Sequence, residues 1–297
     1  MAPLRVAVGF LAFDRCHLVR LALERVLATL PEGWALRVWQ DGAVERKSGR
    51  LVANPRQIER NLALFERLGG DVDYPSEINR ATAEIYWAAE HWAFETVGAD
   101  IAIFVEDDLV ISPHFFAMMA QLGRIALGDA RVGAFSAYGS SALHCVKQMW
   151  YRQRLQPMHH RWGYGITGDY WRRNKADYLN YLEVLDGCDY RARPNAAISA
   201  WIDGLGGAGA VREITGQDGA RTAIMLKLGC FSIMTMPSYA VNIGKSGLHC
   251  TPQFYQGNRW QMKGRHAMFP WQIKLPARLS DAEAERLAAE SRDLRYW

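Results

Sequence analysis

Apolar residues form short continuous runs in the first third of the chain, and segments with helical spacing lie between them. Residues 6–13, 35–39 and 101–105 are such runs, and this pattern is typical of strands buried in a sheet. Apolar residues recur at helical spacing over residues 18–30, 56–68 and 77–97. Strands that alternate with helices predict βαβ units and a mainly parallel sheet.

The pattern becomes less regular beyond residue 130. Strand-like segments at 132–137, 230–235 and 239–243 are separated by loops rich in glycine and aromatic residues. No internal repeat or low-complexity linker occurs. We therefore expect one α/β domain with a mixed, mainly parallel sheet and an irregular second half.

Composition and charge narrow the class of protein. The chain has 297 residues, of which 49% are hydrophobic, so it can form a sizeable core and is not a disordered chain. The net charge is only +4, but residues 242–280 carry six basic residues and no acid, which predicts contact with an anion. The five cysteines are scattered and form no C-x-x-C pair, which argues against a disulfide framework or a zinc knuckle. No apolar run is long enough to span a bilayer, and we expect a cytoplasmic protein.

Three adjacent carboxylates, Glu106-Asp107-Asp108, follow the apolar run 101–105 directly. Ligands of open parallel sheets bind at the carboxyl ends of the strands. Adjacent acids repel one another, and hard divalent cations such as Mg²⁺ bind carboxylate oxygens together with substrate phosphates. The alternative is an acidic cluster that stabilises the next helix dipole, but Ser112-Pro113 already predicts an N-cap and a first-turn proline for a helix over 113–122.

Polar residues also follow the two other predicted parallel strands. Asp14-Arg15 ends the first and Asp41 ends the second. Each residue alone is typical of a turn or a helix cap. Three strands that bring acids and an arginine to one sheet edge indicate a site for a nucleotide.

Two further residues are candidates for chemistry. Asp218 precedes the helical stretch 220–228, where it is suited both to an N-cap and to a general base that accepts a proton from a substrate hydroxyl. His249 lies within the acid-free stretch and is a candidate contact to a metal or a phosphate, although a single histidine is more often structural.

Two glycine-rich segments differ in what they predict. Residues 204–209 satisfy G-x-G-x-x-G, but no acid lies about 20 residues further on, so we expect a flexible loop rather than a dinucleotide site. Trp162, Gly163 and Tyr164 combine aromatic rings with a flexible backbone, which favours an acceptor-sugar platform.

With these motifs, the chain resembles the GT-A-fold glycosyltransferases, in particular the N-acetylglucosaminyltransferase I type and bacterial family-2-like relatives. Ala12-Phe-Asp-Arg15 is similar to the A-C-D-R turn of that family, and Trp39-Gln-Asp41 to its S-Q-D. Val105-Glu-Asp-Asp-Leu109 with Phe115-Phe116 closely matches V-E-D-D-L-x-x-x-x-x-F-F, a version of the D-x-D motif. Weaker similarities follow in the same order over 162–165, at Asp218 and over 237–254.

The resemblance implies a metal-dependent transfer of a sugar from a nucleotide-diphosphate donor, a UDP-sugar by family likeness, to a hydroxyl acceptor with inversion. The acceptor would be a glycan, a lipid-linked saccharide or a polysaccharide, and the sugar a hexosyl or N-acetylhexosaminyl group. The implied residue roles are metal ligation by Asp108 and His249, donor binding by Ala12, Arg15, Asp41, Glu106 and Asp107, proton abstraction by Asp218, and acceptor binding by Trp162, Gly163 and Tyr164. The cation would be Mn²⁺ or Mg²⁺. The catalytic domain would span residues 1–255, and 256–297 would form an extension that packs on it.

Other functions stay open on sequence grounds. A retaining glycosyltransferase or a non-catalytic protein that binds sugar nucleotides or carbohydrates would use the same fold. A nucleotidyltransferase would need a basic glycine-rich loop after the first strand, which residues 9–15 do not provide. Aromatic residues at 269–271 beside basic ones are candidates for peripheral contact with the inner face of a membrane, and nucleic acid is not an expected partner.

Overall fold

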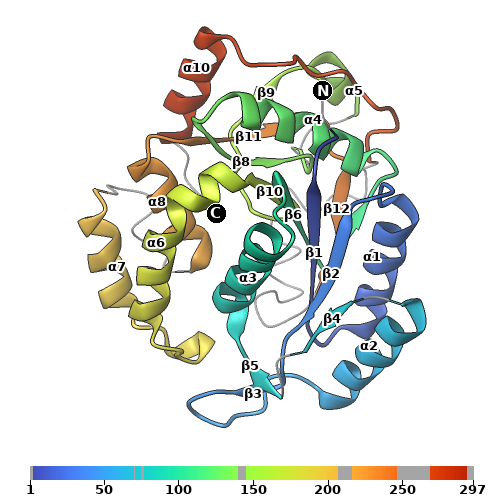
Figure 1. Ribbon diagram of the computed structural model, residues 1–297, viewed down its shortest axis with the longest axis vertical. Coiled ribbons are helices and arrows are strands. Elements are labelled where there is room, and N and C mark those ends of the chain that lie inside the picture. Colours follow the sequence, from blue (N-terminus) through green and yellow to red (C-terminus); the bar gives the residue numbers. More distant parts are fainter. Residues whose placement is uncertain are drawn as a thin grey trace.

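The computed structural model describes residues 3–69, 71–74, 77–139, 145–206, 216–245 and 268–292. An eight-stranded sheet crosses the molecule in the order β4-β2-β1-β6-β10-β8-β11-β9 (Figure 1). Its strands are β1 (Val6–Ala12), β2 (Ala35–Gln40), β4 (Val72–Asp73), β6 (Ile101–Glu106), β8 (Val132–Ser136), β9 (Leu155–Gln156), β10 (Tyr164–Thr167) and β11 (Phe231–Thr235). Two small pairs lie outside it: β3 (Val44–Glu45) with β5 (Ile78–Asn79), and β7 (Leu109–Ile111) with β12 (Ala240–Asn242).

The sheet is mixed and mainly parallel, which confirms the predicted fold class. Strands β4, β2, β1 and β6 are parallel to one another, and β8 is parallel to β11. Strand β10 lies between β6 and β8 and is antiparallel to both, while β9 is antiparallel to β11. The regular half predicted from the sequence is therefore the parallel half of the sheet.

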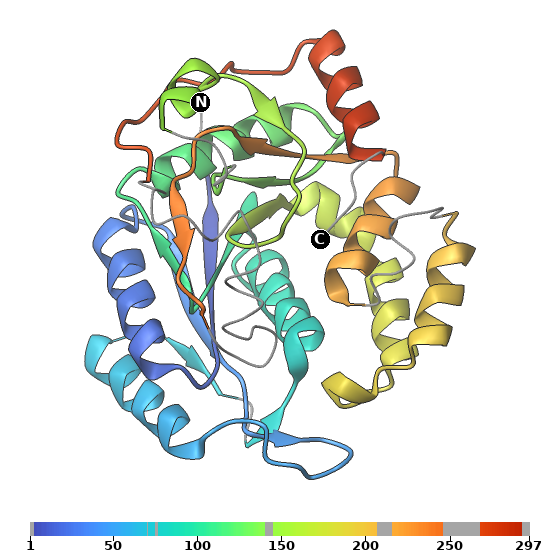
Figure 2. The same ribbon diagram turned by 180° about the vertical axis from the view of Figure 1, so that it is seen from behind.

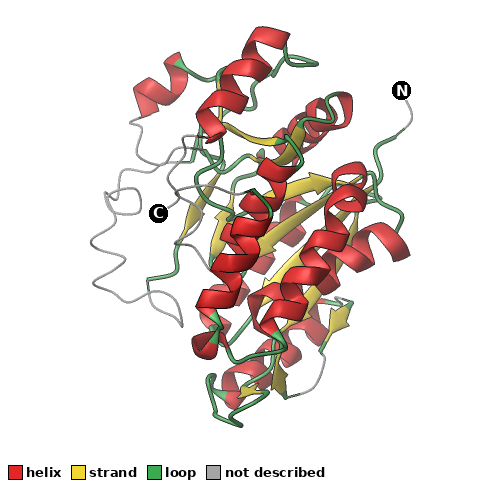
Figure 3. Ribbon diagram, turned by 90° about the vertical axis from the view of Figure 1, so that its left-hand side faces the viewer, coloured by secondary structure: helices red, strands yellow, loops and turns green. Residues whose placement is uncertain are grey.

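Helices cover both faces of the sheet, and Figures 2 and 3 show them from behind and from the side. The helices are α1 (Cys16–Thr29), α2 (Pro55–Leu68), α3 (Ala81–His91), α4 (Phe115–Gly128), α5 (Cys145–Trp150), α6 (Gly168–Leu185), α7 (Asn195–Gly204), α8 (Gln217–Lys227) and α10 (Asp281–Arg292). A π-helical turn, η1 (Trp92–Thr96), extends α3, and a 3₁₀ turn, η2 (Tyr190–Ala192), precedes α7.

Alternating residues of β1 enter two separate cores, as the period of two in a strand requires. Val8 and Phe10 point into the core that α1, α2, α4 and α10 cover. Ala7 and Leu11 point into a second core, which α3, α6 and α8 cover with many aromatic rings. Both faces of the strand are buried, which explains why its sequence is a continuous apolar run. A third cluster joins α6, α7 and α8 to one another.

Three helix starts differ from the prediction. The helix expected over 77–97 begins at Ala81, because Ile78–Asn79 form strand β5. The helix expected from 113 begins at Phe115, and Ser112 Oγ accepts a hydrogen bond from the His114 amide in the turn before it. The helix expected from Ala220 begins at Gln217, and its N-cap residue is Gly216. Asp218 lies inside the first turn of α8 and is not its N-cap residue, so the N-cap role predicted for its side chain is wrong.

The described part of the C-terminal segment packs on the sheet. Phe269, Ile273, Leu275 and residues of α10 belong to the same core as β1. The predicted boundary between 255 and 256 lies outside the described residues, so the division into a domain and an extension stays a prediction. Within the described ranges, no helix combines the length and the hydrophobicity needed to cross a bilayer.

Candidate functional site

The carboxyl ends of three neighbouring parallel strands bring the predicted polar residues to one edge of the sheet. In the register of the sheet, Leu11 of β1 is opposite Glu106 of β6, and Ala12 is opposite Gln40 of β2. Glu106 therefore ends β6 beside the end of β1, and Asp41 follows β2 on the other side. This is the edge at which open α/β sheets bind ligands.

Arg15 connects two acids of the triplet. Its guanidinium forms an ion pair with Asp107 and a second one with Asp108, the latter with 2.9 Å between Nη1 and Oδ2. The Phe13 amide also donates to Asp107 Oδ2 at 3.1 Å. Burial lowers the pKa of Arg15, but the two carboxylates outweigh it and raise that pKa above its usual value. The turn after β1 is thus held directly on the turn after β6.

Asp108 occupies a position that suits a hard cation. Asn242 Nδ2 donates to its Oδ1 at 3.2 Å, and the Ile243 amide donates to its backbone oxygen at 2.8 Å. Gly244 lies so close that a Cβ there would overlap Asp108 Oδ2. Glycine at 244 therefore lets the chain pass close to the Asp108 carboxylate, whose oxygens are of the kind that Mn²⁺ and Mg²⁺ bind.

The acid triplet has a surplus of negative charge. Burial raises the pKa of Glu106 well above its usual range, and the charges of Asp108 and Asp218 raise it further. Burial raises the pKa of Asp107 to about 6, although Arg15 opposes this. Among the described residues, Arg15 is the positively charged side chain that forms ion pairs with this triplet, and it binds Asp107 and Asp108. A bound divalent cation would compensate this charge, so the residues present fit a metal.

Asp41 and Ala12 are fixed by hydrogen bonds, most of them with backbone groups. The Asp41 carboxylate accepts hydrogen bonds from the amides of Gly42 and Arg80 and from Asn79 Nδ2, at 2.7–2.9 Å. Burial raises its pKa to about 6, in spite of these donors. The carbonyl of Ala12 accepts the Asp41 amide at 3.0 Å. Both residues border the edge, and their predicted contact with the nucleoside stays a prediction.

The structure brings Asp218 near the acid triplet, although the two are 110 or more residues apart in sequence. Tyr86 of α3 donates a hydrogen bond to Glu106 Oε1 at 3.0 Å. The charge of Asp218 raises the pKa of both Tyr86 and Glu106, so α8 places its first-turn acid within electrostatic reach of the end of β6. The side chain of Asp218 is half-buried, with a raised pKa caused by burial and opposed by Arg161 and Arg221.

A buried ionic network beneath Asp218 was not found from the sequence. Arg221 Nη1 and Glu90 Oε1 are 2.6 Å apart, and the two side chains are 5% and 0% exposed. The guanidinium of Arg221 also lies 4.0 Å from the ring centroid of Tyr178. The one signal in the sequence is a carboxylate at 90 on the apolar side of α3, where an uncompensated charge would be costly.

The predicted acceptor platform, Trp162, Gly163 and Tyr164, leads directly into strand β10. Tyr164 begins β10, and its ring is fully buried against Tyr86 and Phe104. Gly163 has a φ of +57° and its carbonyl accepts Ser136 Oγ at 2.8 Å. A buried ring offers no face to a sugar in this conformation, so only Trp162, which is partly exposed, is kept as the candidate acceptor platform.

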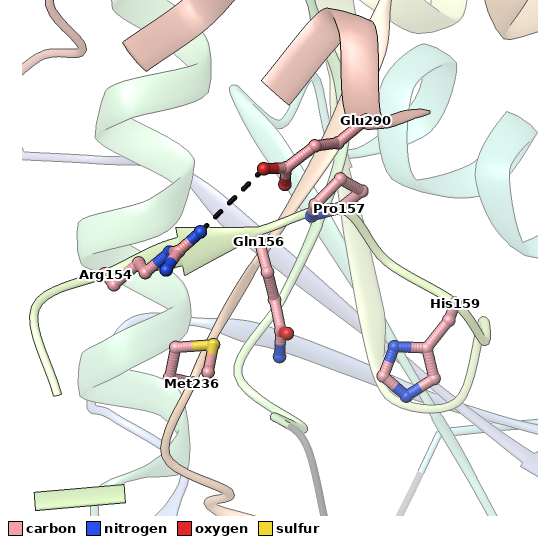
Figure 4. Close-up of a pocket in the computed structure, with 6 residues that line it drawn as sticks. All are labelled: Arg154, Gln156, Pro157, His159, Met236 and Glu290. Atoms are coloured by element: carbon pink, nitrogen blue, oxygen red, sulfur yellow. Dashed lines mark ion pairs between the residues drawn. The ribbon is translucent and has the colours of Figure 1, made fainter. Parts of the chain in front are cut away.

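His249 and most of the segment 204–209 fall outside the described residues. A hollow of about 360 Å³ is lined by Arg154, Gln156, Pro157, His159, Met236 and Glu290 (Figure 4), and it contains no predicted site residue. Across the parts of the chain that the structure describes, no three His, Cys, Asp or Glu side chains are grouped as a metal site.

Comparisons with known proteins find a distant structural likeness and no sequence match. No protein-family model matches the chain, and no curated protein matches it. One solved structure that it resembles is the mannosyltransferase PcManGT from Pyrobaculum calidifontis in complex with GDP-Man and Mn²⁺, with a TM-score of 0.42 and 12% sequence identity. The match covers 76% of this chain and 73% of that one. A likeness of this degree carries no functional inference.

Proposed function

We propose that the protein is a metal-dependent glycosyltransferase of the GT-A type, which moves a sugar from a nucleotide-diphosphate donor to a hydroxyl acceptor. The observation that carries the proposal is the acid triplet 106–108 at the carboxyl end of β6, beside Arg15 and within electrostatic reach of Asp218. The close match of residues 105–116 to the D-x-D segment of that family supports it. A UDP-sugar with a hexosyl or N-acetylhexosaminyl group is the proposed donor.

Asp108 is the proposed ligand of Mn²⁺ or Mg²⁺, with His249 as a second ligand. Divalent cations at phosphate sites use one or two carboxylates and take their other ligands from phosphate and water. When bound, the cation would neutralise negative charge on the diphosphate leaving group. Glu106 and Asp107 would orient the ribose and the donor sugar, while Arg15, Ala12 and Asp41 would border the nucleoside.

Asp218 is the proposed general base. It would accept the proton of an acceptor hydroxyl while the hydroxyl oxygen attacks the anomeric carbon and the bond to the diphosphate breaks. Attack from the face opposite the leaving group inverts the configuration at that carbon. Trp162 would hold the acceptor, a glycan, a lipid-linked saccharide or a polysaccharide. A retaining enzyme would form a product of the opposite anomeric configuration, and a non-catalytic relative would bind the donor without turnover.

A thermal-shift screen of nucleotide diphospho-sugars, each with and without Mn²⁺, tests the proposal and identifies the donor. Ligand at 100 times its Kd stabilises a protein by about 2.7 kcal/mol, because it binds only the folded state. We expect one class of nucleotide sugar to raise the melting temperature by several degrees, and Mn²⁺ to increase that rise. Equal shifts for sugar nucleotides and for unrelated anions would argue against a donor site.

We further propose that the end of the molecule around α5 contacts an anionic membrane surface. Val146, Trp150, Tyr151 and Trp271 have exposed fractions between 46% and 73%. Ser238 connects the two segments, because its amide donates to Gln148 of α5 and its carbonyl accepts the Phe269 amide. Figures 1 and 2 both show the C-terminal segment passing α5. The same two segments carry exposed basic side chains, which favours anionic lipid, at Lys147, Arg152, Lys274 and Arg278.

Replacement of both Trp150 and Trp271 by serine is expected to reduce binding to phosphatidylglycerol vesicles about tenfold or more, because exposed tryptophans insert at the lipid interface. Cosedimentation with vesicles measures this. Leu51→Ser is the matched control, since Leu51 is 58% exposed and lies near β3 at the other end of the molecule. Equal binding of all three proteins, or no binding by the wild type, would contradict a membrane-facing surface.

A further inference from the structure

A chain of side-chain contacts leads from the interior of α3 to the carboxylate of Asp218. Glu90 Oε1 and Arg221 Nη1 are 2.6 Å apart. Arg221 Nε donates to Gln217 Oε1 at 2.9 Å, and Gln217 Nε2 donates to Asp218 Oδ1 at 3.0 Å. Gln217 therefore lies between a buried cation and the proposed base.

The chemistry of Arg221 fixes which way the Gln217 amide faces. A guanidinium has only N–H donors, so the Gln217 atom that it contacts must be the oxygen. The amide nitrogen is then left to face Asp218, and it offers that carboxylate an N–H donor. A donor in this position favours the ionised form of a carboxyl group, which is the form a general base needs.

Arg221 is itself immobilised, so it can hold the amide. Its side chain is 5% exposed, and its guanidinium lies over the rings of Tyr178 and Tyr86. A second contact fixes the backbone of the same turn, because Thr222 Oγ1 donates to the Asp218 carbonyl at 2.8 Å and Arg161 Nη2 donates to Thr222 Oγ1 at 3.3 Å. The first turn of α8 is thus held from α3 and from the segment before β10.

The charges around Asp218 have opposing effects on its ionisation. Burial raises its pKa, whereas Arg161 and Arg221 lower it. Its own charge acts on groups of β6, α3 and α6, namely Glu106, Tyr86, Tyr178 and Tyr181. A small change in the donors around this carboxylate therefore changes the pH range in which it is ionised.

We infer that Gln217 is a positioning residue, clamped by the Glu90–Arg221 ion pair so that its amide N–H orients the Asp218 carboxylate and keeps it ionised. This inference rests on the proposed role of Asp218 as the base. Gln217 need not touch either substrate. Gln217 therefore affects the rate of the reaction and its pH dependence, and it does not affect the affinity for the donor.

The test compares Gln217→Ala and Gln217→Glu with the wild type. Gln217→Glu keeps an oxygen for Arg221 but places a carboxylate against Asp218, whereas Gln217→Ala removes both contacts. A hydrogen bond to a charged group accounts for about one pKa unit. We expect the ascending limb of the kcat profile to move up by about one pH unit in Gln217→Ala and further in Gln217→Glu, with an unchanged Kd for the donor. Gln57→Ala, in the first turn of α2, is the control and should behave as the wild type.

Carboxyl ¹³C NMR of the substrate-free protein separates this inference from the proposed function. The Asp218 signal is assigned from its loss in Asp218→Asn, and its titration midpoint is read in each Gln217 variant. A higher midpoint supports the clamp even if Asp218→Asn keeps its activity, a result that would reject the base assignment alone. An unchanged midpoint in both Gln217 variants overturns the clamp.

Discussion

Replacing Asp218 with asparagine is expected to lower the rate of sugar transfer about 10²–10⁴-fold, the range over which general bases contribute. Asparagine has nearly the same size but cannot accept the proton of the acceptor hydroxyl. Donor binding is expected to remain, because the residues proposed to hold the nucleotide lie at or just after the carboxyl ends of β1, β2 and β6. Initial-rate kinetics and a donor titration on the same preparation measure both quantities.

Asp281→Asn is the matched control for that variant, since Asp281 begins α10 and its side chain is 95% exposed. It should transfer sugar at the wild-type rate. Full transfer activity in Asp218→Asn would reject Asp218 as the base. Loss of donor binding in that variant would show instead that Asp218 belongs to the donor site.

Replacing Arg221 with methionine is expected to lower the free energy of unfolding by about 3–5 kcal/mol. The change removes one partner of an ion pair whose side chains are almost inaccessible to water, and it leaves the Glu90 carboxylate buried without its countercharge. Urea unfolding followed by circular dichroism measures the loss. Lys227→Met on the same helix removes an exposed pair with Asp177 and should cost only about 0–1 kcal/mol.

A double variant separates the uncompensated charge from the lost packing. Glu90→Met combined with Arg221→Met removes both charges, and an apolar pair of similar volume is often neutral to stability. We expect the double variant to be more stable than Arg221→Met alone. If both proteins lose the same stability, packing on Tyr178 rather than the buried charge explains the effect.

The parallel half of the fold could be predicted because its central strands can be recognised from the local sequence alone. Strands β1 and β6 are buried on both faces, so continuous apolar runs mark them, and the acids at their ends mark the ligand edge. Strand β10 has four residues, one of them glycine, and periodicity does not distinguish so short a segment from a loop. Its central, antiparallel position is set by pairing with β6 and β8, which no local pattern records.

The acidic residues of the site could be predicted, but the contacts that control them could not. Glu106, Asp107 and Asp108 are adjacent in sequence and follow a strand, so their juxtaposition needs no tertiary information. The Glu90–Arg221 pair joins residues 131 positions apart, and Gln217 gains its role only because α8 packs there. The sequence predicts Asp218 at the start of a helix. The structure shows that Gln217, which Arg221 contacts, donates a hydrogen bond to its carboxylate.

The most direct test of the account is the Mn²⁺-dependent thermal shift of the best sugar nucleotide, measured in the wild type and in Asp108→Asn. Asparagine at 108 keeps an oxygen for Asn242 but removes the charge that would bind the cation. The account predicts that Mn²⁺ increases the donor-induced shift in the wild type and not in Asp108→Asn, while the shift without metal is similar in both. An equal Mn²⁺ effect in the two proteins, or none in the wild type, would contradict a metal-held diphosphate at the acid triplet.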